Sequence, residues 1–255
     1  MKQHKIFIYG KHAVAEALLH APQAVRKVHM APQMDDRKLR ELIKKTGVVV
    51  ELLDERKATS QVEGGAPHQG VIALISLSGL VMPFENFFET FSPTPDTSLV
   101  FLNEIQDPHN VGAIIRSAAA FGASAVLMST HNQASVTGAV IKASAGTAFS
   151  IPLVEVNTVQ QDLSKLKKAG VKIYGLAGNA PRSVAEEAFV APTMFVFGNE
   201  AHGIAPAARA LCDHILSIPI SPKAESLNVA ASAAVALFAW GARHPKALRK
   251  KEPLS

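Results

Sequence analysis

The sequence has 255 residues, of which 48% are hydrophobic and 18% are charged, and its formal net charge is +5. A chain of this length and composition can bury a sizeable core in one or two domains, which excludes an intrinsically disordered protein. The single cysteine, Cys212, excludes an internal disulfide framework and a cysteine-based zinc site, and it indicates a reducing compartment.

Neither a signal peptide nor a membrane span is predicted. The first apolar run covers only Ile6 to Tyr9. The longest later run, from Val229 to Ala242, is shorter than the roughly 20 residues that a transmembrane helix requires. We therefore expect a soluble cytoplasmic protein without membrane contacts.

The positive charge is concentrated at the two ends of the chain. Residues 1–78 have 12 Lys and Arg against 8 Asp and Glu, and residues 246–255 have 4 against 1. Residues 97–245 are nearly neutral, with 10 against 9. Basic ends suit contact with the phosphate backbone of a nucleic acid, although a merely solvated, slightly basic surface explains the same charges about as well.

Strands and helices alternate over the first 75 residues. Strands are predicted at 5–10, 25–30, 47–53 and 70–75, and helices at 11–19 and 36–46. This alternation predicts a small α/β unit with a mostly parallel or mixed sheet. Gly64 to Gly70 has the composition of a loop, where His68 and Gln69 offer hydrogen-bonding groups, but a loop without a ligand is the commoner meaning.

Residues 79–96 differ from both neighbouring regions because they contain no Lys or Arg but three prolines and four phenylalanines. We predict a linker that contains a short amphipathic helix packed on a domain surface. The expected organisation is a domain at 1–78, a linker at 79–96, a second domain at 97–245 and a frayed basic tail at 246–255.

The α/β alternation resumes at residue 98. Strands are predicted at 99–102, 125–128, 151–156, 171–176, 194–197 and 215–220, and helices at 111–121, 135–145, 159–168, 206–212 and 227–240. The last helix is apolar on every face and has Ser226 or Asn228 as its cap. We expect it to be buried against its own domain or against a second subunit.

Polar loops at 103–110, 198–203 and 221–228 each follow an apolar strand. Ligands bind beyond the carboxyl ends of the strands in an open α/β sheet, so these loops form the candidate site. Arg116 lies in the helix after the first loop, where it either has a polar partner or extends to solvent. With Arg116, the candidate polar residues are Asn110, Asn199, Glu200, Ser226 and Asn228.

Several common signatures are missing, namely G-x-x-x-x-G-K-[ST], a G-x-G-x-x-G after a strand, H-E-x-x-H and paired cysteines. A P-loop NTPase, a Rossmann dinucleotide enzyme and a zinc hydrolase are therefore not indicated, and no metal is expected. The residues alone predict an α/β protein with a basic appended domain and a polar cleft.

The three polar loops resemble the motifs of the SpoU/TrmH family of ribose 2′-O-methyltransferases, in the SPOUT superfamily. The resemblance covers Asn103 to Ser117, Phe195 to Gly203, and Ile218 to Ile220 with Glu225 to Ala230. It extends to Lys142–Gly146, Tyr9–Val14 and His68–Gly70. The N-terminal part resembles members with a small RNA-binding domain of ribosomal-protein type, including the guanosine methyltransferases of large-subunit ribosomal RNA.

The resemblance implies S-adenosylmethionine as the cofactor, a deep trefoil knot threaded by the chain from Cys212 onward, and a homodimer formed through the last helix. Cofactor contacts of the family carry over to Gly198, Ile218, Leu227 and Ala177.

The resemblance also implies a catalytic cluster of Arg116, Asn110, Ser226 and Asn228, with Glu200 orienting it. The family mechanism assigns Arg116 to activating the ribose hydroxyl. A guanidinium stays protonated at neutral pH and is a poor proton acceptor. We therefore hypothesise that Arg116 binds the phosphate of the target and stabilises the forming alkoxide.

The expected activity is S-adenosylmethionine-dependent 2′-O-methylation of RNA, with a 23S ribosomal RNA guanosine as the expected target. Transfer RNA is the alternative substrate, and a catalytically silent RNA-binding or ribosome-assembly protein is the alternative class. Retention of Arg116, Glu200 and Asn228 together argues against a silent protein. The positive N-terminal domain favours a large folded RNA.

Overall fold

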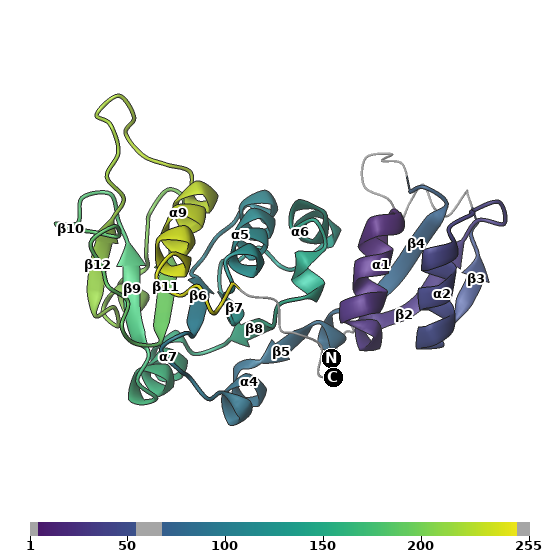
Figure 1. The fold of residues 1–255 in the computed structure, drawn as a ribbon, viewed down its shortest axis with the longest axis horizontal. Helices are drawn as coiled ribbons and strands as arrows, with labels where there is room; N and C mark the ends of the chain where they lie inside the picture. The colour runs from purple at the N-terminus through teal and green to yellow at the C-terminus, as the bar shows by residue number, and fades with distance from the viewer. Residues whose placement is uncertain (1–4, 55–67, 249–255) are drawn as a thin grey trace.

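The computed structural model describes residues 5–54 and 68–248. Two sheets organise the chain (Figure 1): a 4-stranded sheet in the order β1-β4-β2-β3 and an 8-stranded sheet in the order β10-β12-β9-β11-β6-β7-β8-β5. The predicted α/β class is therefore confirmed. Loop residues 64–67 of the predicted Gly64–Gly70 loop lie outside the described residues.

The smaller sheet is mixed, because β1 and β2 pair antiparallel with β4 whereas β2 and β3 are parallel. Asp36 caps its second helix through an acceptor oxygen 3.0 Å from the backbone nitrogen of Leu39. The elements of this unit are β1 (Lys5–Tyr9), α1 (Lys11–His20), β2 (Val25–Met30), α2 (Arg37–Thr46), β3 (Val50–Leu52) and β4 (Val71–Ser76).

Every strand pair of the larger sheet is parallel. Its strands are β5 (Val81–Pro83), β6 (Ser98–Leu102), β7 (Ala125–Ser129), β8 (Leu153–Val156), β9 (Lys172–Leu176), β10 (Arg182–Ser183), β11 (Thr193–Phe197) and β12 (His214–Ser217). The helices of this unit are α4 (Phe84–Thr90), α5 (Pro108–Ala120), α6 (Gly138–Ala143), α7 (Val159–Lys168), α8 (Pro206–Arg209) and α9 (Val229–Gly241).

Helices cover both faces of the larger sheet (Figure 1), which explains why its central strands are continuously apolar. In β6, Val100 and Leu102 pack into the core under α5, α6 and α9, while Leu99 and Phe101 pack into the core with α4, α7 and α8. All five residues of β6 and of β11 are buried. No helix among the described residues is long and apolar enough to cross a membrane.

Residues 79–96 contain the predicted short helix, α4, which buries Phe84 and Phe87. The same segment contributes β5, which pairs in parallel with β8 at the edge of the larger sheet. Part of the expected linker is therefore built into the second unit. The domain boundaries themselves stay a prediction.

Several helices differ from the predicted bounds, among them α8, which covers only Pro206–Arg209 of the predicted 206–212. Helix α5 begins at Pro108, because Asp107 caps it through an oxygen 2.8 Å from the backbone nitrogen of His109 and proline is tolerated at the first helical position. Asn110 therefore lies in the first turn of a helix and not in a loop. Helix α6 is shorter than expected and covers only Gly138–Ala143.

Helix α9 is capped by Asn228, whose Oδ1 accepts from the backbone nitrogens of Ala230 and Ala231 at 2.8 and 3.4 Å. Ser226, the other candidate cap, does not form this contact. One face of α9 is buried in the core, but Val235 and Phe238 on the opposite face are 38% and 62% exposed. Within the single chain, α9 is therefore buried on one face only, and burial of its other face against a second subunit stays a prediction.

Candidate active site

The candidate site is built around Asn110, which is only 9% exposed at the start of α5. Its Nδ2 donates to Oε1 of Glu200 at 2.9 Å, and its Oδ1 accepts from Nδ2 of Asn228 at 3.0 Å. Both ends of the amide are thus engaged, so the side chain is held in one orientation. One buried residue joins the three candidate loops.

Glu200 lies in the loop after β11, and this loop is anchored to the loop after β6. The backbone nitrogen of Gln106 lies 3.5 Å from Oε2 of Glu200. Asn199 donates from Nδ2 to the carbonyl oxygen of Glu104 at 3.0 Å, and its Oδ1 accepts from the backbone nitrogens of Ala201 and His202 at 2.9 and 3.1 Å. The carboxylate is therefore presented by a fixed loop.

Gly198 is required where this loop folds back on itself. A Cβ at this position would lie 2.2 Å from the carbonyl carbon of Gly203 and 2.3 Å from the backbone nitrogen of Ile204. Real Cβ atoms do not approach backbone so closely, and the Asn199 carbonyl closes the turn by accepting from the Gly203 nitrogen at 2.8 Å.

Asn228 connects the site to the positive end of α9. Its oxygen caps the helix while its amide nitrogen donates to Asn110, so a single side chain performs both tasks. The connected hydrogen bonds run from Glu200 through Asn110 and Asn228 to the backbone N–H groups of Ala230 and Ala231 at the start of α9. Such a helix end favours an anionic or carbonyl-bearing group.

Arg116 and Ser226 do not join this hydrogen-bonded chain. Both side chains are exposed. Within residues 5–54 and 68–248, neither forms a hydrogen bond or an ion pair. Of the two alternatives for Arg116, the structure has the one in which the side chain extends to solvent. Its guanidinium is thus available to a partner outside the chain.

Four residues are expected to contact the cofactor. Three of them come immediately after neighbouring parallel strands. Ala177 follows β9, Gly198 follows β11 and Ile218 follows β12, in the strand order β12-β9-β11. They therefore lie at one carboxyl edge of the sheet, where ligands bind in this class of fold. Leu227, the fourth, is 38% exposed and directly precedes Asn228.

The backbone at this edge suits a nucleoside-containing cofactor. In the part of the chain that the structure describes, the N–H and C=O groups of Gly198, Ile218 and Leu227 form no hydrogen bond. Backbone groups of this kind can bind the polar edge of a base, and the half-buried Ile218 and the exposed Leu227 offer apolar surface to its faces. The residues present therefore fit such a group.

Sequence reasoning missed Asn103, which is 2% exposed and lies directly after β6. Its Oδ1 accepts from the backbone nitrogen of Ala205 at 3.0 Å, and its own nitrogen donates to the carbonyl oxygen of Phe197 at 2.9 Å. Asn103 thereby fixes the spacing between two of the site loops. The available signal was an amide side chain immediately after a buried strand.

Tyr174 in β9 and Cys212, two residues before β12, stay neutral at physiological pH. Burial raises the pKa of the Cys212 thiol to about 11. Burial and the nearby Glu187 carboxylate raise the pKa of Tyr174 to about 12. Neither supplies an anionic nucleophile. The described ranges also contain no group of three or more His, Cys, Asp or Glu residues that could hold a metal ion.

Comparison with known proteins identifies both halves of the chain. Residues 97–238 match the model of the SpoU rRNA Methylase family, and residues 7–79 match the model named RNA 2′-O ribose methyltransferase substrate binding.

Two curated relatives are named 23S rRNA (guanosine-2′-O-)-methyltransferase RlmB. The one from Yersinia pestis is 34% identical over 91% of this chain and 94% of its own length. The one from Escherichia coli K12 is 31% identical over 91% of this chain and 96% of its own length.

Among solved structures, the SpoU methyltransferase AviRb from Streptomyces viridochromogenes, in complex with AdoMet, has a TM-score of 0.79. It is 25% identical, and the match covers 94% of this chain and 91% of AviRb.

Proposed function

The chain belongs to the SpoU rRNA methylase family, and from this premise we propose that it methylates the 2′-hydroxyl of a guanosine in 23S ribosomal RNA. The cofactor is S-adenosylmethionine, which supplies a methyl group on a sulfonium. In the reaction a bond would form between the ribose oxygen and the methyl carbon, the electron pair of the broken sulfur–carbon bond would return to sulfur to leave a neutral thioether, and the hydroxyl proton would pass to water. The observation that best supports this reaction is the pair of side-chain hydrogen bonds that join Glu200 to Asn110 and Asn110 to Asn228.

We assign cofactor binding to the carboxyl edge of the larger sheet. The backbone groups of Gly198, Ile218 and Leu227 would bind the cofactor, with Ala177 beside them. Asn228 and the start of α9 lie next to Leu227. The hydrogen-bonded residues Glu200, Asn110 and Asn228 therefore adjoin the proposed cofactor site, which we call the cofactor cradle. This contiguity supports methyl transfer at the junction of the three loops.

In-line transfer requires the ribose oxygen to be held against the methyl carbon, so positioning supplies much of the acceleration. Asn110 and Asn228 would form the fixed wall of the ribose site, Glu200 holds Asn110 in place, and the exposed Ser226 lies at the rim.

Arg116 would bind the phosphate of the target nucleotide and stabilise negative charge as it develops on the ribose oxygen. Its exposure and its lack of a partner among the described residues support this role, since a guanidinium already paired with a carboxylate would not be available.

The N-terminal unit is proposed to bind the RNA. Residues 1–78 have four more basic than acidic residues, and residues 7–79 match the substrate-binding model. Phosphate contacts of this unit would supply affinity without reading the sequence. Ribosomal RNA as the substrate would place the protein in the cytoplasm of a bacterium.

A homodimer through α9 is also proposed. Val235 and Phe238 form an exposed apolar stripe opposite the buried face of this helix. An unpaired apolar helix face is covered in most stable proteins, and a second copy presents the same stripe by two-fold symmetry.

The trefoil knot remains part of the proposal. The chain beyond α9 is fastened by His244, whose ring nitrogens lie 2.9 Å from Oδ1 of Asp96 and 3.0 Å from the carbonyl oxygen of Phe189. We infer that the segment from Cys212 onward is threaded, as the family resemblance implies. An experimental structure in which the segment after Cys212 does not pass through a loop of the earlier chain would contradict this inference.

The activity is tested by incubating the protein with radiolabelled S-adenosylmethionine and either unmodified 23S ribosomal RNA or unmodified transfer RNA. Incorporation into the ribosomal RNA is expected. Incorporation into transfer RNA alone would assign a different substrate, and cofactor binding without incorporation into either RNA would indicate a catalytically silent RNA-binding protein.

A further inference from the structure

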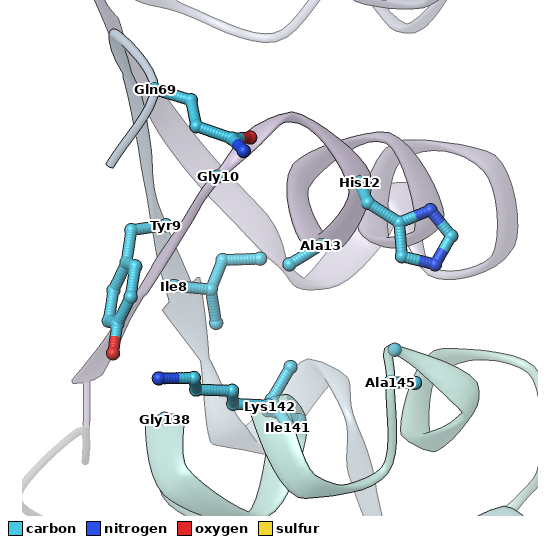
Figure 2. A pocket seen from close by; sticks show the side chains of 11 residues that line it. Ile8, Tyr9, Gly10, His12, Ala13, Gln69, Gly138, Ile141, Lys142 and Ala145 are labelled. Atoms are coloured by element: carbon cyan, nitrogen blue, oxygen red, sulfur yellow. The ribbon is translucent and has the colours of Figure 1, made fainter. Parts of the chain in front are cut away.

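A cavity of about 370 Å³ lies between the N-terminal unit and α6 (Figure 2). One wall is the end of β1 with the start of α1, and the other is α6 with the turn after it. Three stretches outside the site loops resemble the family, namely Tyr9–Val14, His68–Gly70 and Lys142–Gly146. All three stretches contribute residues that line the cavity. The family-like residues that lie outside the active site are therefore found together at one cavity.

The walls of this cavity approach each other closely at its edges. A Cβ on Gly138 would lie 2.9 Å from the carbonyl oxygen of Phe7, and a Cβ on Gly146 would lie 3.0 Å from Cγ of Glu16. Gly146 also has a φ of +83°, which an L side chain rarely adopts. The cavity is therefore a space left inside an otherwise tight contact between the two units.

The cavity combines apolar walls with a few polar groups. Ile8, Ala13 and Ile141 supply apolar surface. The Lys142 ammonium lies 5.9 Å from the centroid of the Tyr9 ring, and Figure 2 shows it extending toward that residue across the opening. Among the described residues, Lys142 forms no ion pair and the Tyr9 hydroxyl forms no hydrogen bond.

We propose that this cavity binds one unstacked nucleotide of the RNA substrate, with its base against the Tyr9 ring and its phosphate at Lys142. A base has flat apolar faces and a polar edge, and single-stranded RNA is recognised by stacking on aromatic side chains. The volume falls in the lower part of the range of about 300–1,000 Å³ seen for small-ligand sites. An ammonium without a carboxylate partner suits a phosphate.

Gln69 adds a donor at the edge of the cavity opposite Lys142 (Figure 2). Its Oε1 accepts from the backbone nitrogen of Lys11 at 3.0 Å, which leaves its amide nitrogen to donate to an acceptor of the base.

The cavity is one helix away from the methyl-transfer site. Helix α6 packs on α5 so closely that a Cβ on Gly112 would lie 2.4 Å from the Cβ of Ala143. Gly112 is two residues after Asn110, while Lys142 on the same α6 lines the cavity. A nucleotide held there would anchor the RNA while a different nucleotide enters the active site. This inference rests on the proposed RNA substrate.

The test measures the affinity of the full-length protein for an unmodified 23S ribosomal RNA transcript over a series of salt concentrations. Tyr9→Ala is expected to weaken binding about tenfold, and Tyr9→Phe is expected to bind like the wild type because the ring face remains. Lys142→Ala is expected to reduce the slope of log Kd against log salt by about 0.7. Lys168→Ala is the matched control, because Lys168 is an exposed lysine on α7, on the opposite face of the sheet.

Circular dichroism and thermal unfolding establish that each variant is folded. If Tyr9→Ala and Lys142→Ala bind RNA no more weakly than Lys168→Ala, the cavity is not an RNA site. Guanosine monophosphate is added as a second probe. If it binds the wild type but not Tyr9→Ala while RNA affinity is unchanged, the cavity serves a free nucleotide and the RNA assignment is overturned. Absence of methyl transfer by the wild type would instead contradict the proposed function.

Discussion

The Nδ2 of Asn228 donates to Oδ1 of Asn110 at 3.0 Å, across 118 positions of the sequence. The same Asn228 caps α9 with its oxygen, and the same Asn110 donates to Glu200. A capping residue is thereby joined to a buried amide that is itself held by a carboxylate. Activity and helix capping can be separated experimentally at this pair.

Asn228→Asp keeps an excellent capping oxygen but removes the donor to Asn110. We expect stability close to that of the wild type and a turnover reduced about 100-fold, because small misplacements at a reacting centre have effects of that order. Asn228→Ala, which also loses the cap, is expected to cost about 1 kcal/mol of stability in addition. Methyl transfer and thermal unfolding are measured on both. Wild-type turnover in the Asp variant would remove this hydrogen bond from the mechanism.

Arg116 is exposed and has no hydrogen bond or ion pair with the rest of the described chain. If it stabilises the forming alkoxide, Arg116→Ala should lower turnover by about 10² to 10³. Arg116→Lys should be impaired at every pH without moving the pH–rate limb, because a lysine is a point charge that lacks the bidentate fork. A fully active Lys variant with a shifted limb would indicate that this residue accepts the hydroxyl proton.

Gly198→Ala places a Cβ where the backbone of Gly203 already lies. Overpacking of this kind costs about 1–3 kcal/mol, so the loop should shift and S-adenosylmethionine should bind about tenfold or more weakly by calorimetry. Gly178→Ala is the matched control, because no atom lies within 4 Å of a Cβ there. Equal affinity in the two variants would show that this loop does not form the cofactor cradle.

Phe238 is 62% exposed on the apolar stripe of α9. Phe238→Glu should give a particle near the 27.1 kDa of one chain by light scattering, whereas the wild type should have about twice that mass. Leu52→Glu changes another exposed apolar residue, 74% exposed on β3, and should remain dimeric. A wild-type protein that is monomeric at micromolar concentration would contradict the proposed dimer.

The central strands were predictable because burial on both faces of a parallel sheet leaves continuous apolar runs, as in Ser98–Leu102 and Thr193–Phe197. The two residues of β10 are too few for any periodicity. The start of α5 was missed because polar residues such as His109 and Asn110 look like loop, and only Asp107-Pro108 signals the helix.

The candidate residues were found through three motifs, but their contacts were not predictable from the sequence. The bond between Asn110 and Asn228 depends on α9 packing beside α5, which follows from the whole sheet order. Asn103 was missed because its role is to fix the spacing of loops that are distant in sequence. The local sequence pattern predicts the helices and strands, whereas tertiary packing decides which polar side chains come into contact.

Methylation of a ribose oxygen is tested by mapping the methylated 23S ribosomal RNA after alkaline hydrolysis. A 2′-O-methyl group blocks cleavage of the following phosphodiester, so labelled methyl should appear in one alkali-resistant dinucleotide that begins with guanosine. Label recovered only in mononucleotides would place the methyl group on a base and would contradict the proposed function of the Glu200–Asn110–Asn228 site.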